Sequence, residues 1–255
     1  MRFLKGHGTG NDFVILPDAP ELTPSLVAAL CDRRFGIGGD GVLRVARSSL
    51  PGVDWFMDYW NSDGSLAEMC GNGARVFARY LESAGLAAGT VPIETRAGVV
   101  RAVIGEQTIS VDMGLPKVYG ESTATVTGRV YEGTAVDCGN PHLVCPLPDG
   151  VSLSSLDLDR PPAYDHDFYP AGVNVEFYEP VAPAHVRMRV YERGSAETLS
   201  CGTGAVAVAT VARGAASSVT VDVPGGRVQV HFPPDTVWLE GPAVLVAAGE
   251  TTIAG

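Results

Sequence analysis

The chain has 255 residues, of which 45% are hydrophobic and 18% are charged, a composition typical of folded globular proteins. Its formal net charge of −11 excludes the basic surface that nucleic acids or anionic membranes need, and no apolar run reaches the roughly 18 to 20 residues of a membrane span. Lys5 and His7 interrupt the first residues before a secretory signal could form, so we expect a cytoplasmic protein without nucleic-acid or membrane partners.

Short runs rich in β-branched residues, bounded by turn residues, predict that strands dominate both halves of the chain. Two segments predict helices that end before Gly85 and Gly214, and the second is apolar on every side and therefore buried. A Pro-Gly-Gly turn at 224–226 predicts a hairpin. In chain order, the expected elements are strands at 13–16, 91–95, 99–104, 108–112, 173–177, 186–191, 219–223, 228–232 and 237–239, with helices at 75–84 and 205–212.

The chain contains an internal repeat. C-G-N-G-A at 70–74 is matched by C-G-T-G-A at 201–205, and G-N-D-F-V-I-L-P-D at 10–18 resembles G-N-P-H-L-V-C-P-L-P-D at 139–149. The distance from Asn11 to Cys70 is 59 residues, and that from Asn140 to Cys201 is 61. This agreement indicates an ancient duplication.

The repeat predicts an α/β fold of the α+β type with two pseudo-symmetric lobes, each a curved mixed sheet wrapped around one central buried helix. We expect residues 1–116 to form the N-terminal lobe, completed by 242–255, and residues 117–241 to form the C-terminal lobe. The site should lie where the lobes meet.

Five cysteines, an odd number without any C-x-x-C pair, are expected to be mostly free thiols. Cys70 and Cys201 each open a predicted helix, where unsatisfied N–H groups favour a thiolate and bind anions. If the repeats face each other, one thiolate can remove a proton from a tetrahedral carbon while the opposing thiol protonates the other face. This arrangement suits the inversion of a stereocentre, whereas a lone free cysteine is more often a small buried hydrophobe.

No cofactor or metal is expected. A pyridoxal phosphate enzyme needs a Schiff-base lysine, and neither Lys5 nor Lys117, the only two lysines, has a convincing phosphate-binding context. The histidines and cysteines show no compact metal-binding spacing. A developing carbanion would then be stabilised by the N–H groups of the two helix starts.

Polar residues around the two repeats fit a zwitterionic substrate, although single asparagines near turns are usually backbone caps. Arg193 could bind a carboxylate with two hydrogen bonds or form an ordinary surface salt bridge, and His142 could assist proton transfer or be structural. The polar candidates are Asn11, Asn61, Asn72, Asn140, Asn174, Glu192, Arg193 and Thr203.

At this point the sequence closely resembles the diaminopimelate epimerase family over nearly its whole length. Thr9 stands where members commonly carry Leu, and Gly41 stands where some carry Gln. The motifs that carry the resemblance are G-H-G-T-G-N-D-F-V at 6–14, C-D-R-R-F-G-I-G-G-D-G-V-L at 31–43, N-S-D-G-S-L-A-E-M-C-G-N-G-A-R at 61–75, G-N-P-H at 139–142, G-V-N-V-E-F at 172–177, Y-E-R-G-S-A-E-T-L-S-C-G-T-G-A at 191–205 and V-P-G-G at 223–226.

The resemblance implies interconversion of LL- and meso-diaminopimelate without a cofactor, in lysine and peptidoglycan biosynthesis, with Cys70 and Cys201 as the two bases. It places His142 and Glu192 close to the reacting thiols, and it leaves a homodimer open. The substrate contacts that it implies are Asn11, Asn61, Gly71, Asn72, Asn140, Asn174, Glu192, Arg193, Gly202 and Thr203.

Two alternatives remain open at this stage. One is another two-cysteine racemase or epimerase of the same fold, acting on proline, hydroxyproline or histidine. The other is a thiol-regulated binding protein in which Cys70 and Cys201 form a disulfide.

Overall fold

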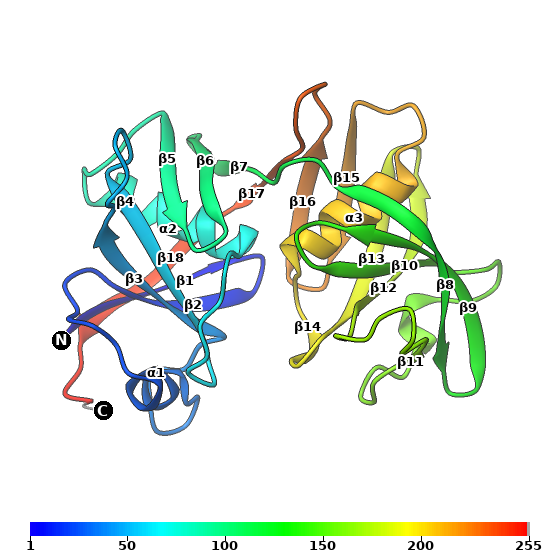
Figure 1. The fold of residues 1–255 in the computed structure, drawn as a ribbon, viewed down its shortest axis with the longest axis horizontal. Coiled ribbons are helices and arrows are strands. Elements are labelled where there is room, and N and C mark those ends of the chain that lie inside the picture. Colours follow the sequence, from blue (N-terminus) through cyan, green and yellow to red (C-terminus); the bar gives the residue numbers. More distant parts are fainter. Residues whose placement is uncertain (254–255) are drawn as a thin grey trace. The chain divides into compact units, whose positions relative to one another are not determined.

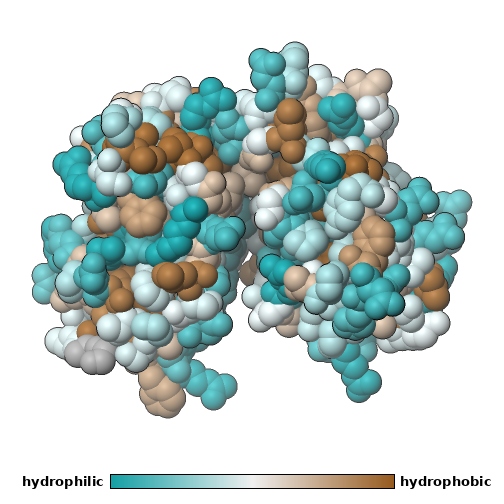
Figure 2. All heavy atoms as spheres, in the orientation of Figure 1, coloured by the Kyte–Doolittle hydropathy of each residue, from teal (hydrophilic) through white to brown (hydrophobic). Residues whose placement is uncertain are grey.

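The computed structural model describes residues 1–253, and the chain forms two compact units (Figure 1). The first unit contains Met1–Asp112 and the C-terminal segment from Gly241, and the second contains Met113–Glu240. No helix among the described residues is long and apolar enough to cross a membrane. On the face shown in Figure 2, hydrophobic side chains of each unit lie in small groups among hydrophilic ones.

The first unit has one sheet in which the order of pairing is β18-β1-β2-β3-β4-β5-β6-β7. The β2–β3 and β4–β5 pairs are parallel, and the others are antiparallel. Its elements are β1 (Arg2–Gly8), β2 (Asn11–Leu16), α1 (Pro24–Cys31), β3 (Gly41–Arg47), β4 (Trp55–Asn61), α2 (Gly71–Ser83), β5 (Thr90–Thr95), β6 (Gly98–Ile104), β7 (Thr108–Asp112) and β18 (Val244–Glu250).

The second unit pairs its strands in the order β8-β9-β10-β12-β13-β15-β16-β17, with β10–β12 and β13–β15 parallel. Two short strands, β11 and β14, pair with β8 and β13. Its elements are β8 (Lys117–Val126), β9 (Arg129–Asp137), β10 (Pro141–Pro146), the 3₁₀ helix η1 (Leu153–Ser155), β11 (Ala163–Tyr164), β12 (Asn174–Ala182), β13 (His185–Glu192), β14 (Ala196–Thr198), α3 (Gly202–Ala212), β15 (Ser218–Val223), β16 (Gly226–His231) and β17 (Trp238–Pro242).

The two units repeat one sequence of parallel and antiparallel pairs, strand for strand. In each, a long helix follows the same strand and precedes a parallel pairing: α2 connects β4 to β5, and α3 lies between β13 and β15. The edge strand differs in its origin, because β18 of the first unit comes from the end of the chain whereas β8 of the second precedes its partner β9. The duplication is therefore visible in the topology.

The two central helices are buried for different sequence reasons. Residues Ala205–Ala209 of α3 are all inaccessible to solvent and apolar, as predicted from the sequence. Helix α2 buries both apolar side chains and Arg75, whose guanidinium is completely inaccessible. Gly85 and Gly214, which follow the two helices, have positive φ angles of 69° and 54°, a conformation that glycine adopts without a steric penalty.

Candidate active site

Cys70 and Cys201 occupy equivalent positions, each as the N-cap of its unit's long helix. The sulfur of Cys70 accepts a hydrogen bond from the backbone N–H of Gly73 at 3.3 Å, and that of Cys201 accepts from Gly204 at 3.4 Å. Each sulfur therefore lies where the helix dipole and free N–H groups favour negative charge. Gly71 and Gly202, the first residues of the helices, keep these N–H groups free of side-chain cover.

In the first unit, an asparagine cluster surrounds Cys70. The Asn11 carbonyl oxygen Oδ1 lies 3.7 Å from the Cys70 sulfur and accepts from Asn72 Nδ2 at 3.2 Å. The amide of Asn11 in turn donates to Asp40 Oδ2 at 2.8 Å, which fixes the orientation of its side chain. Asn11 is therefore held by both the helix start and the loop before β3.

In the second unit, Cys201 is buried among acidic groups. Its sulfur lies 3.5 Å from Thr203 Oγ1, and the carboxyl of Glu192 lies close enough to act on it electrostatically. Burial, together with the charges of Glu192 and Glu176, raises the pKa of the Cys201 thiol well above its ordinary value. Burial also raises the pKa of Glu192, whose carboxyl accepts from the Thr198 hydroxyl. Cys201 is therefore a protonated thiol at neutral pH.

His142 and Glu176 form a buried pair beneath the start of α3. His142 Nδ1 lies 2.6 Å from Glu176 Oε1, both side chains are fully inaccessible, and His142 Nε2 lies 2.9 Å from Asn140 Oδ1. Glu176 Oε1 accepts a hydrogen bond from Nδ1, so this nitrogen carries a proton, and Nε2 faces the side-chain amide of Asn140. Glu176 was not predicted from the sequence, although an acidic residue inside an apolar strand is a signal of a buried polar contact.

The remaining predicted contacts are anchored by backbone groups or by a neighbouring side chain. Asn174, at the start of β12, donates to the Pro141 carbonyl at 3.0 Å and accepts from the backbone N–H of Arg193 at 3.0 Å. The exposed Arg193 guanidinium donates to the Ala171 carbonyl at 2.9 Å, so it forms a backbone contact there. Asn61, at the end of β4, donates to Ser65 Oγ at 3.0 Å.

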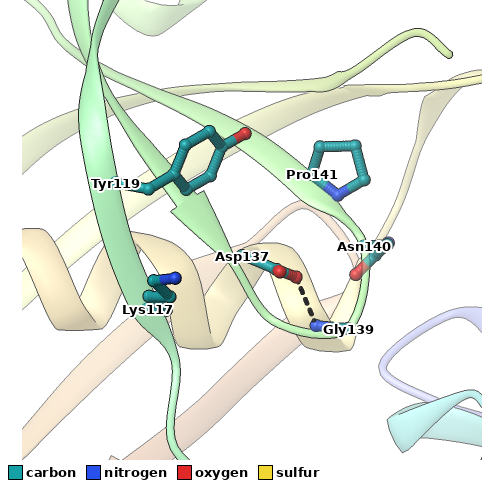
Figure 3. A pocket seen from close by; sticks show the side chains of 6 residues that line it. All are labelled: Lys117, Tyr119, Asp137, Gly139, Asn140 and Pro141. Carbon is teal, nitrogen blue, oxygen red and sulfur yellow. Dashed lines mark hydrogen bonds between the residues drawn. The ribbon is translucent and has the colours of Figure 1, made fainter.

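A cavity of about 390 Å³ in the second unit opens beside one of these residues (Figure 3). Asn140 lines it, and Asp137 accepts a hydrogen bond from Gly139 N at 2.8 Å at its rim. Its lining also brings charges of both signs together. The lining residues are Lys117, Tyr119, Asp137, Gly139, Asn140 and Pro141.

None of the other three cysteines is the N-cap of a helix: Cys31 ends α1, Cys138 precedes β10 and Cys145 lies within β10. All five cysteines are free thiols in the structure. Burial raises the pKa of Cys31 to about 12 and raises the pKa values of Cys138 and Cys145 as well.

The duplication also exposes an asymmetry under the two helix starts. His142 pairs with Asn174 in the β10–β12 register as Phe13 pairs with Gly41 in the β2–β3 register, so His142 and Phe13 correspond. A Cβ at Gly73 would lie 3.4 Å from Leu43 and 3.5 Å from Phe13. The first unit therefore has an apolar floor where the second has an ionisable pair.

This difference predicts opposite tolerance to alanine at matched positions. A Cβ at Gly204 would lie 2.7 Å from Glu176 Oε1, which His142 holds in place, whereas the contacts at Gly73 are ordinary van der Waals distances. We expect Gly204→Ala to lower the free energy of unfolding by about 1–3 kcal/mol through overpacking, and Gly73→Ala to lower it by clearly less. Urea unfolding of both variants measures this, and equal losses would contradict the assigned geometry.

Comparison with known proteins identifies the family that the chain matches. The sequence profile of the diaminopimelate epimerase family matches residues 3–119 and 134–251. Diaminopimelate epimerases from Corynebacterium aurimucosum and Thermobifida fusca are each 48% identical to the chain; each alignment covers 99% of this chain, and 100% and 98% of the relative, respectively. That from Corynebacterium glutamicum strain ATCC 13032 is 48% identical, with 98% of both chains covered.

Solved structures show the same fold at low sequence identity. A predicted epimerase from Pseudomonas aeruginosa has a TM-score of 0.73 and 15% identity, with 99% of both chains covered. A probable proline racemase from Agrobacterium radiobacter K84 has a TM-score of 0.72 and 16% identity, with 99% of this chain and 93% of that chain covered. The fold prediction is confirmed, and the profile match together with the 48% identity shows that the chain belongs to the diaminopimelate epimerase family.

Proposed function

We propose that this chain interconverts LL- and meso-diaminopimelate by a two-base mechanism, as a step of lysine and peptidoglycan biosynthesis in the cytoplasm. Family membership carries the substrate assignment, since the relatives at 48% identity are named diaminopimelate epimerases over their full length. The observation that carries the mechanism is the presence of two free cysteines, each capping the central helix of one repeat.

In the proposed reaction, one cysteine thiolate takes the α-proton and the other thiol donates its proton to the opposite face of the same carbon. The C–H bond electrons pass into the α-carboxylate as an enolate-like charge, and the two thiols exchange their protonation states. The backbone N–H groups at the starts of α2 and α3 are the donors that stabilise this charge. Microscopic reversibility requires the same two groups for the return reaction.

Recognition of the substrate is assigned to polar groups that flank the two cysteines. Asn11 and Asn72 lie against Cys70, and Thr203 and Glu192 lie against Cys201. Amides, which both donate and accept, suit a substrate that carries ammonium and carboxylate groups. The further proposed contacts are Asn61, Gly71, Asn140, Asn174, Arg193 and Gly202, with His142 as a further group near the reacting thiols.

Proton NMR of the enzyme with LL-diaminopimelate in heavy water tests this proposal, with reduced thiols, a metal chelator and no added pyridoxal phosphate. We expect deuterium to enter one α-position as the meso isomer forms, because each turnover replaces the abstracted proton from a solvent-exchanged thiol. Proline and histidine are run in parallel. Exchange confined to either of these amino acids would replace the substrate, and absence of exchange in all samples of folded protein would overturn the proposal.

A further inference from the structure

Arg75 is a fully buried cation with little compensation. The described residues provide its guanidinium with one hydrogen bond, from Nη2 to Thr9 Oγ1 at 3.3 Å, while Nε and Nη1 have no hydrogen-bond partner. Desolvation lowers the pKa of this arginine to about 10, which still leaves it charged at neutral pH. Burying an unpaired charge is costly, so its presence calls for a role beyond packing.

The guanidinium lies at the cysteine end of α2. Helical side chains point back toward the N-terminus of their helix. A Cβ built on Gly8 would lie 3.0 Å from Arg75 Nη2 and 3.2 Å from the backbone oxygen of Asn72, so the guanidinium lies beside the first turn of α2. Asn72 contacts Asn11, which contacts the Cys70 sulfur. The charge of a Cys70 thiolate acts on this guanidinium and raises the pKa of Arg75 against the lowering by burial.

Other charged groups around α2 are compensated or exposed. His7 Nδ1 accepts from the Gly10 N–H, while Glu68, in the loop before Cys70, and Glu250, at the end of β18, are exposed. The charged pairs are Lys5 and Arg33 with Asp12, Arg33 with Asp40, Arg44 and Arg96 with Asp58, Arg79 with Glu82, Arg101 with Asp112, and Arg2 with Asp18. Arg75 therefore supplies the uncompensated positive charge on the inner side of this helix.

The second unit has no such cation at the matching place. In the repeat C-G-N-G-A-R against C-G-T-G-A-V, the counterpart of Arg75 is Val206, which is fully buried in an apolar cluster. Cys201 instead has the carboxyl groups of Glu192 and Glu176 as its charged neighbours. Near-symmetric helix starts thus carry electrostatic surroundings of opposite sign.

We propose that Arg75 is a positioning residue that stabilises the thiolate of Cys70, so that Cys70 is the base and Cys201 the acid in the resting enzyme. A positive charge in a low-dielectric interior favours a nearby thiolate, and negative charges favour a thiol. The fold then determines, before substrate binds, which of the two cysteines is the thiolate and which is the thiol. Its catalytic meaning rests on the proposed function, but the charge effect itself concerns the free protein.

Thr9 helps to hold the guanidinium of Arg75 in this position. It lies in the turn between β1 and β2 with a φ of 52°, a left-handed conformation that is unfavourable for a β-branched residue. Its hydroxyl accepts the hydrogen bond from Arg75, and the turn leads directly into Asn11. The Thr9 side chain therefore holds the guanidinium against the turn beside Cys70.

The test is the pH dependence of iodoacetamide alkylation of Cys70, followed by peptide mass spectrometry because the chain has five cysteines. We compare wild type with Arg75→Met, Arg75→Gln and Arg75→Lys. The two neutral variants should shift the midpoint of the Cys70 profile upward by at least about one pH unit, and the lysine variant should shift it by less than half as much. Arg79→Met, on the same helix but paired with Glu82, should leave it in place.

If Arg75 had a purely structural role, its replacement would lower stability and leave the Cys70 midpoint unchanged. The proposal predicts a different pattern. The neutral variants should melt at or above the wild-type temperature, because they remove an unpaired buried charge, while kcat falls about tenfold or more with little change in KM. An unshifted Cys70 midpoint in a folded neutral variant, or an equal shift in Arg75→Lys, would overturn the proposal. If neither neutral variant folds, wild type decides: a Cys70 midpoint at or above that of Cys201 would overturn it. Alkylation needs no substrate, so a failure of the diaminopimelate exchange experiment would refute the proposed function without touching this result.

Discussion

Cys70→Ala and Cys201→Ala should each lower the rate of diaminopimelate epimerisation by about a thousand-fold or more, because each removes one of the two groups that exchange a proton with the α-carbon. The structure gives no reason for either variant to unfold. Each sulfur accepts a backbone hydrogen bond at a helix start, and alanine there costs about 0.5–2 kcal/mol of stability. The measurement is the interconversion of the LL and meso isomers at saturating substrate.

Two controls make the result specific. Cys31→Ala and Cys145→Ala remove buried thiols that lie outside the proposed site, and both should retain epimerase activity. Cys70→Ala and Cys201→Ala should each still exchange the α-proton of one stereoisomer with heavy water, since the remaining thiol reaches one face of the carbon. The stereoisomer that exchanges should differ between the two variants. Wild-type turnover in either site variant would refute the two-base assignment.

The sequence was sufficient for the two helix starts because both carry the same short pattern. Cysteine followed by two spaced glycines before an apolar segment identifies Cys70 and Cys201 as N-caps, and both were found as such. Strands with clean β-branched runs, such as β5, β7 and β15, were also predicted within a residue or two. Local chemistry and local structure agree in these segments.

Other strands were missed because they do not carry that local signal. Strand β3 contains Arg44 and Arg47, β4 contains the buried Asp58, and β8 is mostly polar, so period and composition did not indicate strands there. Asp58 is satisfied by arginines from β3 and from the loop after β5, a contact that only the folded sheet creates. Tertiary pairing overrides local preference at such positions.

The charges behind the two cysteines could not be predicted from the spacing of motifs. Arg75 reads as an ordinary polar residue of an amphipathic helix, and its burial follows from the approach of the Gly8–Thr9 turn. Glu176 comes from β12, 25 residues before Cys201 in the chain, and meets it only through the sheet. A repeat predicts the symmetry of a site, whereas the packing around it determines where that symmetry is broken.

Glu192→Gln should reduce kcat by about 10²- to 10⁴-fold, the range for removal of a group that takes part in proton transfer. Glu192 accepts a hydrogen bond from Thr198 and interacts electrostatically with Cys201, and burial raises the pKa of its carboxyl. When Cys201 becomes a thiolate during turnover, such a carboxyl can hold a proton, so that the pair never carries two negative charges. Glutamine keeps the shape and the acceptor oxygen but cannot take up the proton.

The same substitution should make Cys201 more reactive, not less. The charge of Glu192 contributes to raising the pKa of Cys201, so its removal should move the alkylation midpoint of Cys201 to lower pH while catalysis falls. Glu197→Gln is the matched control, because Glu197 lies on the adjacent strand β14 and is paired with Arg189 at 2.7 Å. It should change neither property.

The pH dependence of stability separates this role from simple damage to the fold. A carboxyl whose folded-state pKa is raised stabilises the protein while it is protonated, and this contribution is lost as the pH rises through the folded-state pKa. Glu192→Gln removes that loss, so its free energy of unfolding relative to wild type should increase from acidic to neutral pH. A variant that loses activity, gains Cys201 reactivity and gains relative stability with rising pH would show that a costly half-buried acid is retained at this position for proton transfer. A uniform loss of stability at all pH values, with unchanged Cys201 reactivity, would instead assign Glu192 to packing.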